Sequence, residues 1–428
     1  MKIHVDSQRL QREIEELARI SEDTPPAVTR VLFSEADLRA RKFVKGLCEE
    51  AGLAWRHDAV GNQFARLPGQ RQDAAPVATG SHIDAIPNAG KYDGVVGVLG
   101  AIEALRALQR AGFRPQHPIE LIVFTAEEPT RFGIGCVGSR LMSGVLSPGR
   151  AADLKDEAGQ RLEDLRKAAG FTGPLDAVRL KQGAYAGFIE LHIEQGPLLE
   201  QEGLAIGIVE KIAAPSTLRL RLTGVGGHAG GVLMPDRHDA LLAGAEIALA
   251  VEAAARGSGS PDTVGTTGVF RIQPGAVNSV PCAAWLEVDL RDTQLATRDG
   301  TLQRIERAAQ EACKRRGVAL EMERLNADPP AICDPGLIRD VTEACKQVGA
   351  SHRRMISRAY HDTLFMAQLC PATMIFIPCR GGFSHRPDEY ASPEHIETGV
   401  RVLAGTLAAA AGTGDLNRSQ SRAPFAAP

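Results

Sequence analysis

Apolar positions follow two different patterns along the chain, and each pattern predicts a different kind of strand. Near the start, residues 75–81 (APVATGS) and 119–126 (IELIVFTA) form short, continuous apolar runs. Such runs are typical of strands that are buried on both faces of a parallel sheet. Between them, residues 95–112 place apolar side chains on one helical stripe, and Gly112 stands where that helix would end. The sequence therefore predicts a strand, helix, strand crossover.

From Ser216 onward the pattern changes to a strict alternation of apolar and charged positions, which is typical of half-exposed antiparallel strands. Three segments show it: 216–224 (STLRLRLTG), 283–291 (AAWLEVDLR) and 318–325 (VALEMERL). Between them we expect another strand and two helices, at 264–273, about 236–256 and about 294–316. The resulting order, βαββαβ, is that of a ferredoxin-like unit.

The first pattern returns after this unit, with a continuous apolar strand at 373–379 (TMIFIPC) and an amphipathic helix that ends at Gly412. Proline-bearing joints bracket the unit on both sides, which suits chain crossings between domains. We therefore predict an α/β protein in which a small domain is inserted into a large one. The predicted parts are residues 1–213 and 327–411 for the large domain, 214–326 for the inserted domain, and 412–428 for a disordered tail.

Length, composition and charge narrow the class of protein. At 428 residues the chain exceeds the roughly 100 to 200 residues of one domain, in agreement with an insertion. The net charge of −3 offers no attraction to nucleic acid or an anionic membrane, so we expect neither of those partners. The start of the chain lacks an apolar signal segment, which predicts a cytoplasmic protein. Eight cysteines without CxxC spacing are expected to be reduced and mostly buried.

Polar clusters follow the predicted strands. In GSHIDAIPNAGKYDG (80–94), His82 and Asp84 come after the first buried strand and Asp93 precedes the helix. This junction is where open α/β sheets bind ligands. A plainer interpretation is that Asp93 caps the helix and Asp84 forms a turn. This segment alone leaves both interpretations open.

Three further clusters occupy equivalent places. TAEEP brings Glu127 and Glu128 to the end of the second buried strand, where adjacent carboxylates repel each other unless a cation or proton lies between them. ELHIEQG and FSHRP add His192 and His385, although a lone histidine is more often a packed or surface residue. Together the strand ends carry imidazole and carboxylate groups, the ligand mix for borderline divalent metals. The predicted metal residues are His82, Asp93, Glu128, His192 and His385.

The inserted domain carries a fifth cluster, TGVGGHAGGVLMP (223–235). It places His228 among glycines, which permit close approach of the backbone, and this histidine could donate to a developing oxyanion. Asn278 and Arg291 follow in the same domain, and arginine suits a substrate carboxylate. A flexible surface loop and a solvated arginine are the plainer alternatives.

The combination of GSHID, KYDG, EEPTRFG, ELHIEQGP, GHAG and FSHRP, from about residue 10 to 411, resembles the M20 family of metal-dependent amidohydrolases and exopeptidases. Within that family it resembles the branch that cleaves carbamoyl groups. GKYDGVVGVLGAIEAL, VLMP, ISRAYHD and MIFIPC are most similar to the members that act on ureidoglycolate. Tyr360 stands where the carbamoylase and allantoate members tend to have glycine, and its role stays open.

The resemblance implies a fold and a role for each site residue. The large mixed-sheet domain would be a dinuclear metallohydrolase domain, and the inserted ferredoxin-like domain would be a lid and the contact of a homodimer. Two divalent metals per subunit, Mn²⁺ by preference or Zn²⁺, would bind the five residues above, with Asp93 bridging. Glu127 would be the general acid and base, and the Asp84 carboxylate would orient His82. Substrate contacts are implied for Gln195, His228, Asn278, Arg291 and His361.

The implied reaction is hydrolysis of a ureido or amide C–N bond by metal-activated water, most similar to conversion of ureidoglycolate to glyoxylate, ammonia and carbon dioxide. N-carbamoyl-L-amino acid hydrolase and allantoate amidohydrolase activities are alternatives, because they share every metal ligand. An aminopeptidase fits less well, since Gln195, Asn278 and Arg291 match the carbamoyl-cleaving branch. A non-catalytic binding protein also fits less well, because the ligand set and Glu127 are complete.

Overall fold

The computed structural model describes residues 3–412, which form two compact units. Unit 1 contains the chain up to Glu210, residues 332–355 and the chain from His361 onward. Unit 2 contains residues 211–331 and 356–360. The predicted tail (412–428) lies outside the described residues, except for Gly412, which is the last residue of helix α12.

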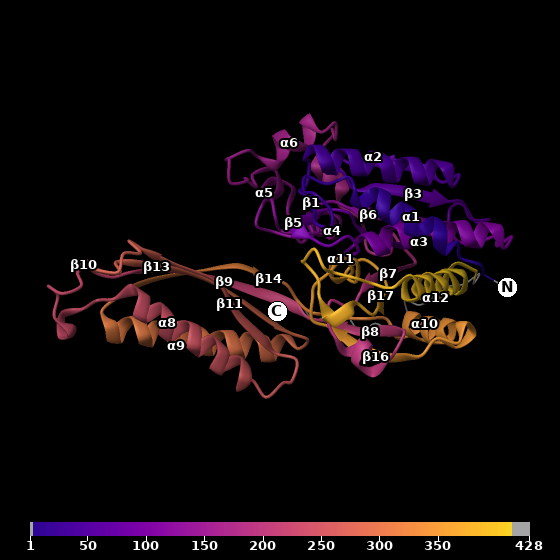
Figure 1. The fold of residues 1–428 in the computed structure, drawn as a ribbon. Coiled ribbons are helices and arrows are strands. Elements are labelled where there is room, and N and C mark those ends of the chain that lie inside the picture. Colours follow the sequence, from indigo (N-terminus) through magenta and orange to yellow (C-terminus); the bar gives the residue numbers. More distant parts are fainter. Residues whose placement is uncertain (1–2, 413–428) are drawn as a thin grey trace. The chain divides into compact units, whose positions relative to one another are not determined.

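A nine-stranded sheet is the centre of unit 1 (Figure 1), in the order β15-β8-β17-β7-β4-β6-β3-β2 with β16 beside β8. Its strands are β2 (Ala54–His57), β3 (Gln63–Leu67), β4 (Val77–His82), β6 (Ile119–Phe124), β7 (Gly187–Ile193), β8 (Ile206–Ile212), β15 (Ala331–Ile332), β16 (His352–Ser357) and β17 (Ala372–Ile377). A separate pair joins β1 (Val28–Arg30) to β5 (Ala85–Ala89). The four strands β17, β7, β4 and β6 are mutually parallel, so their carboxyl ends meet at one edge of the sheet.

The buried strands predicted from continuous apolar runs are confirmed as β4, β6 and β17, with no end shifted by more than two residues. All residues of these three strands are buried, because helices cover both faces of the sheet. One shift matters for the site: His82 is the last residue of β4 rather than the residue after it.

The helices of unit 1 are α1 (Ser7–Ala18), α2 (Glu35–Glu50), α3 (Val95–Arg110), α4 (Val137–Ser143), α5 (Pro148–Ala152), α6 (Leu162–Ala168), α7 (Leu198–Glu202), α10 (Pro335–Val348), α11 (Asp362–Met366) and α12 (Pro393–Gly412), with 3₁₀ turns η1 (Leu175–Val178) and η3 (Arg380–Gly382). Neighbouring residues of β7 show which face α3 and α11 cover. The Leu191 side chain packs against Gly100 of α3, whereas Glu190 accepts a hydrogen bond from Thr363 of α11. Since successive side chains of a strand point to opposite faces, α3 and α11 lie on opposite sides of the sheet.

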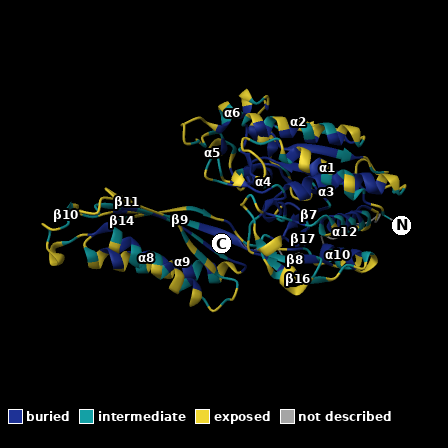
Figure 2. Cartoon of the chain, in the orientation of Figure 1, coloured by how far each residue is buried: buried dark blue, intermediate teal, exposed yellow. Residues whose placement is uncertain are grey.

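Unit 2 is a four-stranded antiparallel sheet with two long helices packed against one face. The sheet has the order β11-β13-β9-β14, and a short ladder joins β10 to β12. The elements are β9 (Ala214–Thr223), β10 (Gly227–His228), η2 (Met234–Asp236), α8 (Ala240–Arg256), β11 (Val264–Gln273), β12 (Ser279–Val280), β13 (Ala283–Asp292), α9 (Leu295–Arg316) and β14 (Ala319–Ala327). Buried and less buried positions alternate along β9 and β13, which confirms the predicted alternation (Figure 2).

Helix α8 begins about four residues later than the sequence pattern predicts. The 3₁₀ turn η2 ends at Asp236, and Asp239 then caps α8 by accepting a hydrogen bond from the Leu242 N–H at 3.2 Å. A proline at position 235 and this aspartate cap are sufficient physical reasons for the later start.

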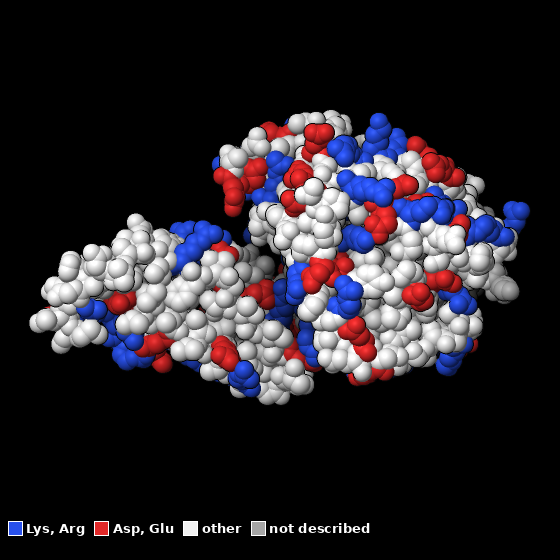
Figure 3. Space-filling view, viewed as in Figure 1, with Lys and Arg blue, Asp and Glu red and all other residues white. Residues whose placement is uncertain are grey.

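Surface features agree with the composition. Lysine and arginine are interspersed with aspartate and glutamate on the face seen in Figure 3, without one dominant sign of charge. All eight cysteines are free thiols, and seven of them are buried, with Cys282 the more accessible one. Between residues 3 and 412, no helix is both long and apolar enough to cross a membrane.

Candidate metal centre

The described residues contain three groups of potential metal ligands, and the two that consist of the predicted ligands meet at the carboxyl edge of the parallel strands of unit 1; the third is Glu190, His192 and His361. The inner group consists of His82, Asp93 and His192, and the outer group consists of Asp93, Glu128 and His385. In each group the ligand atoms lie within 4.8 Å of one another, and Asp93 belongs to both groups. The structure therefore brings together all five residues that the sequence predicts as metal ligands.

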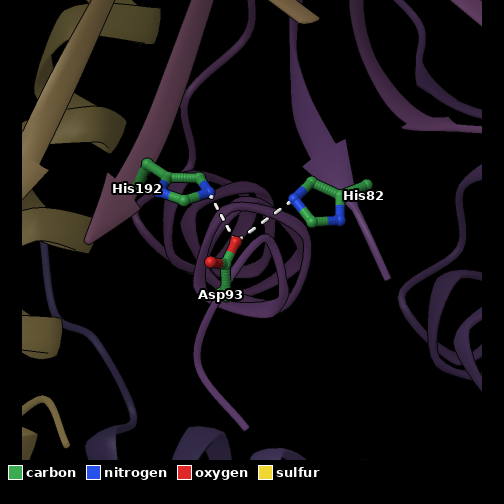
Figure 4. A group of neighbouring side chains, drawn as sticks. All are labelled: His82, Asp93 and His192. Atoms are coloured by element: carbon green, nitrogen blue, oxygen red, sulfur yellow. Dashed lines mark ion pairs between the residues drawn. The ribbon is translucent and has the colours of Figure 1, made fainter. Parts of the chain in front are cut away.

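The inner group is buried and tightly oriented (Figure 4). Asp93 Oδ1 lies 3.3 Å from His82 Nε2 and 3.2 Å from His192 Nε2. On the far side of each ring, Nδ1 lies within hydrogen-bond distance of a main-chain carbonyl: 3.0 Å from Asp84 O for His82, and 2.9 Å from Ile193 O for His192. A carbonyl can only accept, so each Nδ1 carries the proton. With Nδ1 so held, each imidazole turns its Nε2 toward Asp93, which is the orientation that a metal ligand needs.

The outer group is more accessible. His385 Nε2 lies 3.4 Å from Asp93 Oδ2 and 3.2 Å from Glu128 Oε1, and the His385 side chain is 44% exposed, whereas Glu128 is buried. Hydrogen bonds to Asp93 and Glu128 raise the pKa of His385 to about 11. The two carboxylates thus create a place for positive charge, which a proton or a cation can fill.

Asp93 shows the same preference for cations. Burial by itself would raise the pKa of Asp93, but hydrogen bonds with His192, His385 and His82 outweigh burial and hold the pKa well below its usual range. The aspartate is therefore a buried anion surrounded by imidazoles from three separate segments of the chain. Such a carboxylate, with Oδ1 toward the inner histidines and Oδ2 toward His385, suits a ligand that both groups share.

Gly94 explains how Asp93 reaches His82. Gly94 has a φ of 64°, and a Cβ atom at this position would lie 2.5 Å from His82 Nε2. Glycine alone provides this left-handed turn without a clash. The N-cap of α3 is Gly94, without a side-chain capping bond. Asp93 therefore does not cap the helix, and the plainer interpretation from the sequence is wrong.

Glu127 lies beside the inner group. Its Oε2 is 3.7 Å from His82 Nε2, and its Oε1 is 3.7 Å from the Cys136 thiol. Burial, aided by the nearby Glu128 carboxylate and only partly offset by His82, raises the pKa of Glu127 well above its usual range. A buried carboxyl group with a raised pKa beside a candidate cation site is suited to general acid and base chemistry.

The Asp84 carboxylate does not make the contact that the sequence predicts. His82 Nδ1 is 3.0 Å from the Asp84 main-chain carbonyl oxygen but 3.7 Å from its carboxylate. The carboxylate instead accepts the main-chain N–H groups of Glu127, at 3.3 Å, and Glu128, at 3.0 Å. Burial raises the pKa of Asp84 to about 6. Asp84 therefore orients His82 through its backbone, and its side chain holds the segment with the two glutamates.

Two predicted substrate contacts lie in unit 1. Gln195 has a φ of 54°, and its Nε2 donates to Asp93 Oδ2 at 2.6 Å. His361 is buried, with its ring 4.5 Å from that of His192. Ala126 and His385 also have positive φ, of 53° and 59°. Non-glycine residues in this region are uncommon and cluster at functional sites. The substrate-binding roles of Gln195 and His361 stay predictions.

The other predicted substrate contacts lie in unit 2, at opposite ends of its sheet. His228 pairs with Ser279, and the Ala229 N–H donates to the Asn278 carbonyl at 2.8 Å, so these segments are adjacent near the start of β13. His228 Nδ1 accepts the Gly230 N–H at 3.1 Å, which leaves Nε2–H as a donor. Arg291 lies at the other end of β13, hydrogen-bonded to the Asp289 carboxylate at 2.6 Å.

Sequence reasoning missed two residues that contact the shared ligand. Ser384 Oγ lies 2.7 Å from Asp93 Oδ2, and Glu389 accepts the Asp93 main-chain N–H at 3.1 Å. Both follow β17 in irregular backbone, where no periodicity indicates burial. Their proximity to His385 in FSHRPDE was the one available signal.

Comparisons with known proteins show what this chain is similar to. A ureidoglycolate hydrolase of Oryza sativa subsp. japonica is 51% identical over 412 residues, which is 95% of this chain and 85% of the relative. An N-carbamoyl-L-amino acid amidohydrolase of Geobacillus stearothermophilus is 36% identical, over 94% of this chain and 98% of the relative. A crystal structure of AtUAH in complex with glyoxylate matches with a TM-score of 0.90 and 50% identity, over 96% of this chain and 98% of that chain. Another structure of AtUAH, in complex with (S)-hydroxyglycine, matches equally well.

The family comparison gives the broader classification. The profile of "Peptidase family M20/M25/M40" matches residues 78–409, which include all five residues of the inner and outer groups. The match covers most of the chain, and the similar proteins above align over nearly all of it. The chain therefore belongs to peptidase family M20/M25/M40.

Proposed function

We propose that this hydrolase cleaves ureidoglycolate, releasing glyoxylate, ammonia and carbon dioxide. The observation that carries the proposal is the 51% identity to a ureidoglycolate hydrolase over 95% of the chain, against 36% for the carbamoyl-amino acid relative. The glyoxylate and (S)-hydroxyglycine bound in the similar crystal structures correspond to the expected product and to its immediate precursor. The substrate is a small carboxylate-bearing ureide, in accord with a buried, strongly polar site.

Two divalent metals per subunit would bind the inner and outer groups, with Asp93 shared between them. The donor set fits them, because three imidazoles and two carboxylates are available and the inner imidazoles are oriented by main-chain carbonyls. Bound divalent ions supply Lewis-acid chemistry, lowering the pKa of water and polarising the ureido oxygen. Mn²⁺ is our preferred ion, and Zn²⁺ is the alternative.

Glu127 would move the proton. It is a buried carboxyl group 3.7 Å from His82 Nε2, and its pKa is raised by burial. It would accept a proton from the attacking water and donate it to the leaving nitrogen of the ureido group. Asp84 would keep Glu127 in place through the main-chain N–H that its carboxylate accepts. His228 would donate its Nε2–H to the tetrahedral oxyanion, which the hydrogen bond at its Nδ1 favours.

The arrangement of unit 2 supports a homodimer. His228 and Asn278 lie near one end of β13 and Arg291 at the other, separated by about 25 Å of strand at roughly 3.3 Å per residue. One copy of this lid domain cannot present all three side chains to one small substrate. We therefore propose that His228 and Asn278 serve the site of a partner subunit. Dimers assembled from one parent subunit and one subunit with a substituted Arg291 would show whether Arg291 serves the site of its own subunit. The cytoplasmic location stays a prediction.

A substrate panel tests the proposed function. Metal-free protein is reconstituted with Mn²⁺ or, separately, with Zn²⁺, and is given ureidoglycolate, allantoate, N-carbamoyl-β-alanine and an N-carbamoyl-L-amino acid in parallel. We expect kcat/KM for ureidoglycolate to exceed the others by at least about 100-fold, the discrimination available to a site built around specific polar contacts. A higher kcat/KM for an N-carbamoyl amino acid or allantoate would assign the chain to that activity instead.

A further inference from the structure

Glu389 is a buried carboxylate that contacts the loop of the shared metal ligand. It is 4% exposed and follows His385 by four residues. Its Oε1 accepts the main-chain N–H groups of Tyr92, at 2.8 Å, and Asp93, at 3.1 Å. These bonds join segments that are nearly 300 residues apart in the chain. The backbone that carries Asp93 is thus held by the segment that carries His385.

Gly90, in the segment before Tyr92 and Asp93, leaves room for the Glu389 carboxylate. A Cβ atom on Gly90 would lie 2.3 Å from Glu389 Cβ and 2.5 Å from its Oε1. The φ of Gly90 lies outside the left-handed region, so the backbone itself does not demand glycine, and the three atoms nearest to such a Cβ all belong to Glu389. The requirement for glycine at this position is therefore evidence of how closely Glu389 packs against the loop.

A second contact reaches the Asp93 side chain. Ser384 Oγ lies 2.8 Å from Glu389 Oε2 and 2.7 Å from Asp93 Oδ2. Glu389 therefore acts on Asp93 from two directions, through the main-chain N–H and through the serine. It is not a member of either metal group. Its contacts fix where the shared carboxylate stands without contributing a ligand atom.

We infer that Glu389 is a positioning residue whose main-chain hydrogen bonds hold Asp93 where the inner and outer groups share it. Two buried main-chain N–H groups need an acceptor, and the Glu389 side-chain oxygen supplies it to both. Loss of such a supporting contact typically lowers metal affinity by about 10- to 100-fold. The inference rests on the proposed function in one respect: the two groups must bind metal.

The experiment measures two quantities on the full chain. The first is the Mn²⁺ and Zn²⁺ dissociation constant of metal-free protein, by competition with a chelating dye. The second is hydrogen exchange of the amides in peptides covering residues 90–95, without metal. The variants Glu389→Ala and Gly90→Ala should weaken metal binding at least about tenfold and speed exchange at Tyr92 and Asp93. Glu389→Gln should stay within about threefold of the parent, because its amide oxygen can still accept both N–H groups.

Matched controls separate positioning from general damage. Glu103→Ala removes another buried carboxylate that accepts a remote main-chain N–H, that of Asp6 at 2.8 Å, and should lower the melting temperature without changing metal affinity. Gly46→Ala adds a Cβ where nothing lies within 4 Å.

The inference would be overturned if Glu389→Ala had the metal affinity and the amide exchange of the parent. It would also be overturned if Glu389→Gln bound metal as weakly as Glu389→Ala. A parent that binds neither ion would refute the proposed function, while amide exchange would still decide the role of Glu389.

Discussion

The inner and outer groups share Asp93 but differ in how firmly their other residues are held. In the inner group, His82 ends β4 and His192 lies in β7, and both are buried with Nδ1 bonded to a main-chain carbonyl. In the outer group, His385 lies in irregular backbone eight residues after β17, with a φ of 59° and a side chain that is 44% exposed.

Two metal groups at the same edge of a sheet can therefore differ in how rigidly their residues are held. Ligands on strands inherit the rigidity of the sheet, whereas a ligand on a connecting segment depends on local contacts. We therefore expect a tightly held inner metal and a more readily exchanged outer metal. The four predictions below test that comparison.

Removing the shared ligand should abolish the difference between the groups. Asp93→Ala takes a ligand from both, so we expect fewer than one bound metal per subunit and a fall in kcat/KM of at least about 10⁵-fold, since metal activation of water is lost. Elemental analysis after dialysis and a glyoxylate assay measure these effects. Two retained metals would contradict the assignment of Asp93 as the shared ligand.

The adjacent glutamates should separate chemistry from metal binding. Glu127→Gln should lower kcat by about 1000-fold, the usual contribution of a general acid and base, with both metals retained. Glu128→Gln should lose the outer metal. The two side chains are almost equally buried, at 7% and 6% exposed, so each variant is the structural control of the other. Loss of metal in Glu127→Gln would mean that Glu127 is a ligand.

The two histidines should differ in stability as well as in metal binding. His192→Ala opens a cavity in a buried position and should lower the free energy of unfolding of the metal-free protein by about 2 kcal/mol. His385→Ala opens no buried cavity and should lower it by less, through the loss of the contacts with Asp93 and Glu128. Each should remove one metal. Denaturant titration and elemental analysis check both effects, and equal destabilisation would show that the groups are equally embedded.

A change in unit 2 should leave both groups intact. Arg291→Lys keeps the charge but loses the bidentate geometry that suits a carboxylate, so we expect KM for ureidoglycolate to rise about tenfold with two metals still bound. Steady-state kinetics with metal analysis provides the measurement. An unchanged KM would indicate that Arg291 has a structural role, through its hydrogen bond to Asp289.

How far the sequence predicts the fold depends on the kind of strand. The alternating pattern located β13 to within one residue, at Ala283–Asp292 against the predicted 283–291, because period-two burial marks both ends of a half-exposed strand. Continuous apolar runs located β4 and β6 less sharply, since the apolar character runs on beyond the last ladder bond. The start of α8 depended on a local cap at Asp239 that the helical period does not reveal.

The site divides in the same way. Residues at the ends of parallel strands, such as His82 and His192, could be expected to converge because the topology brings those ends to one edge. The carbonyl contact of His82 and the burial of Glu389 against Tyr92 depend on long-range packing, which leaves no periodic trace in the sequence. Nor could the sequence reveal that His228 and Arg291 lie at opposite ends of one sheet.

Turnover of ureidoglycolate during a metal titration tests the central claim most directly. Metal-free protein receives Mn²⁺ in steps from zero to three equivalents per subunit, and glyoxylate release is measured at each step. If both groups are required and the inner group fills first, activity should stay low up to one equivalent, rise between one and two, and then level off. Full activity at one equivalent, or no glyoxylate at any ratio with Mn²⁺ or Zn²⁺, would contradict the account.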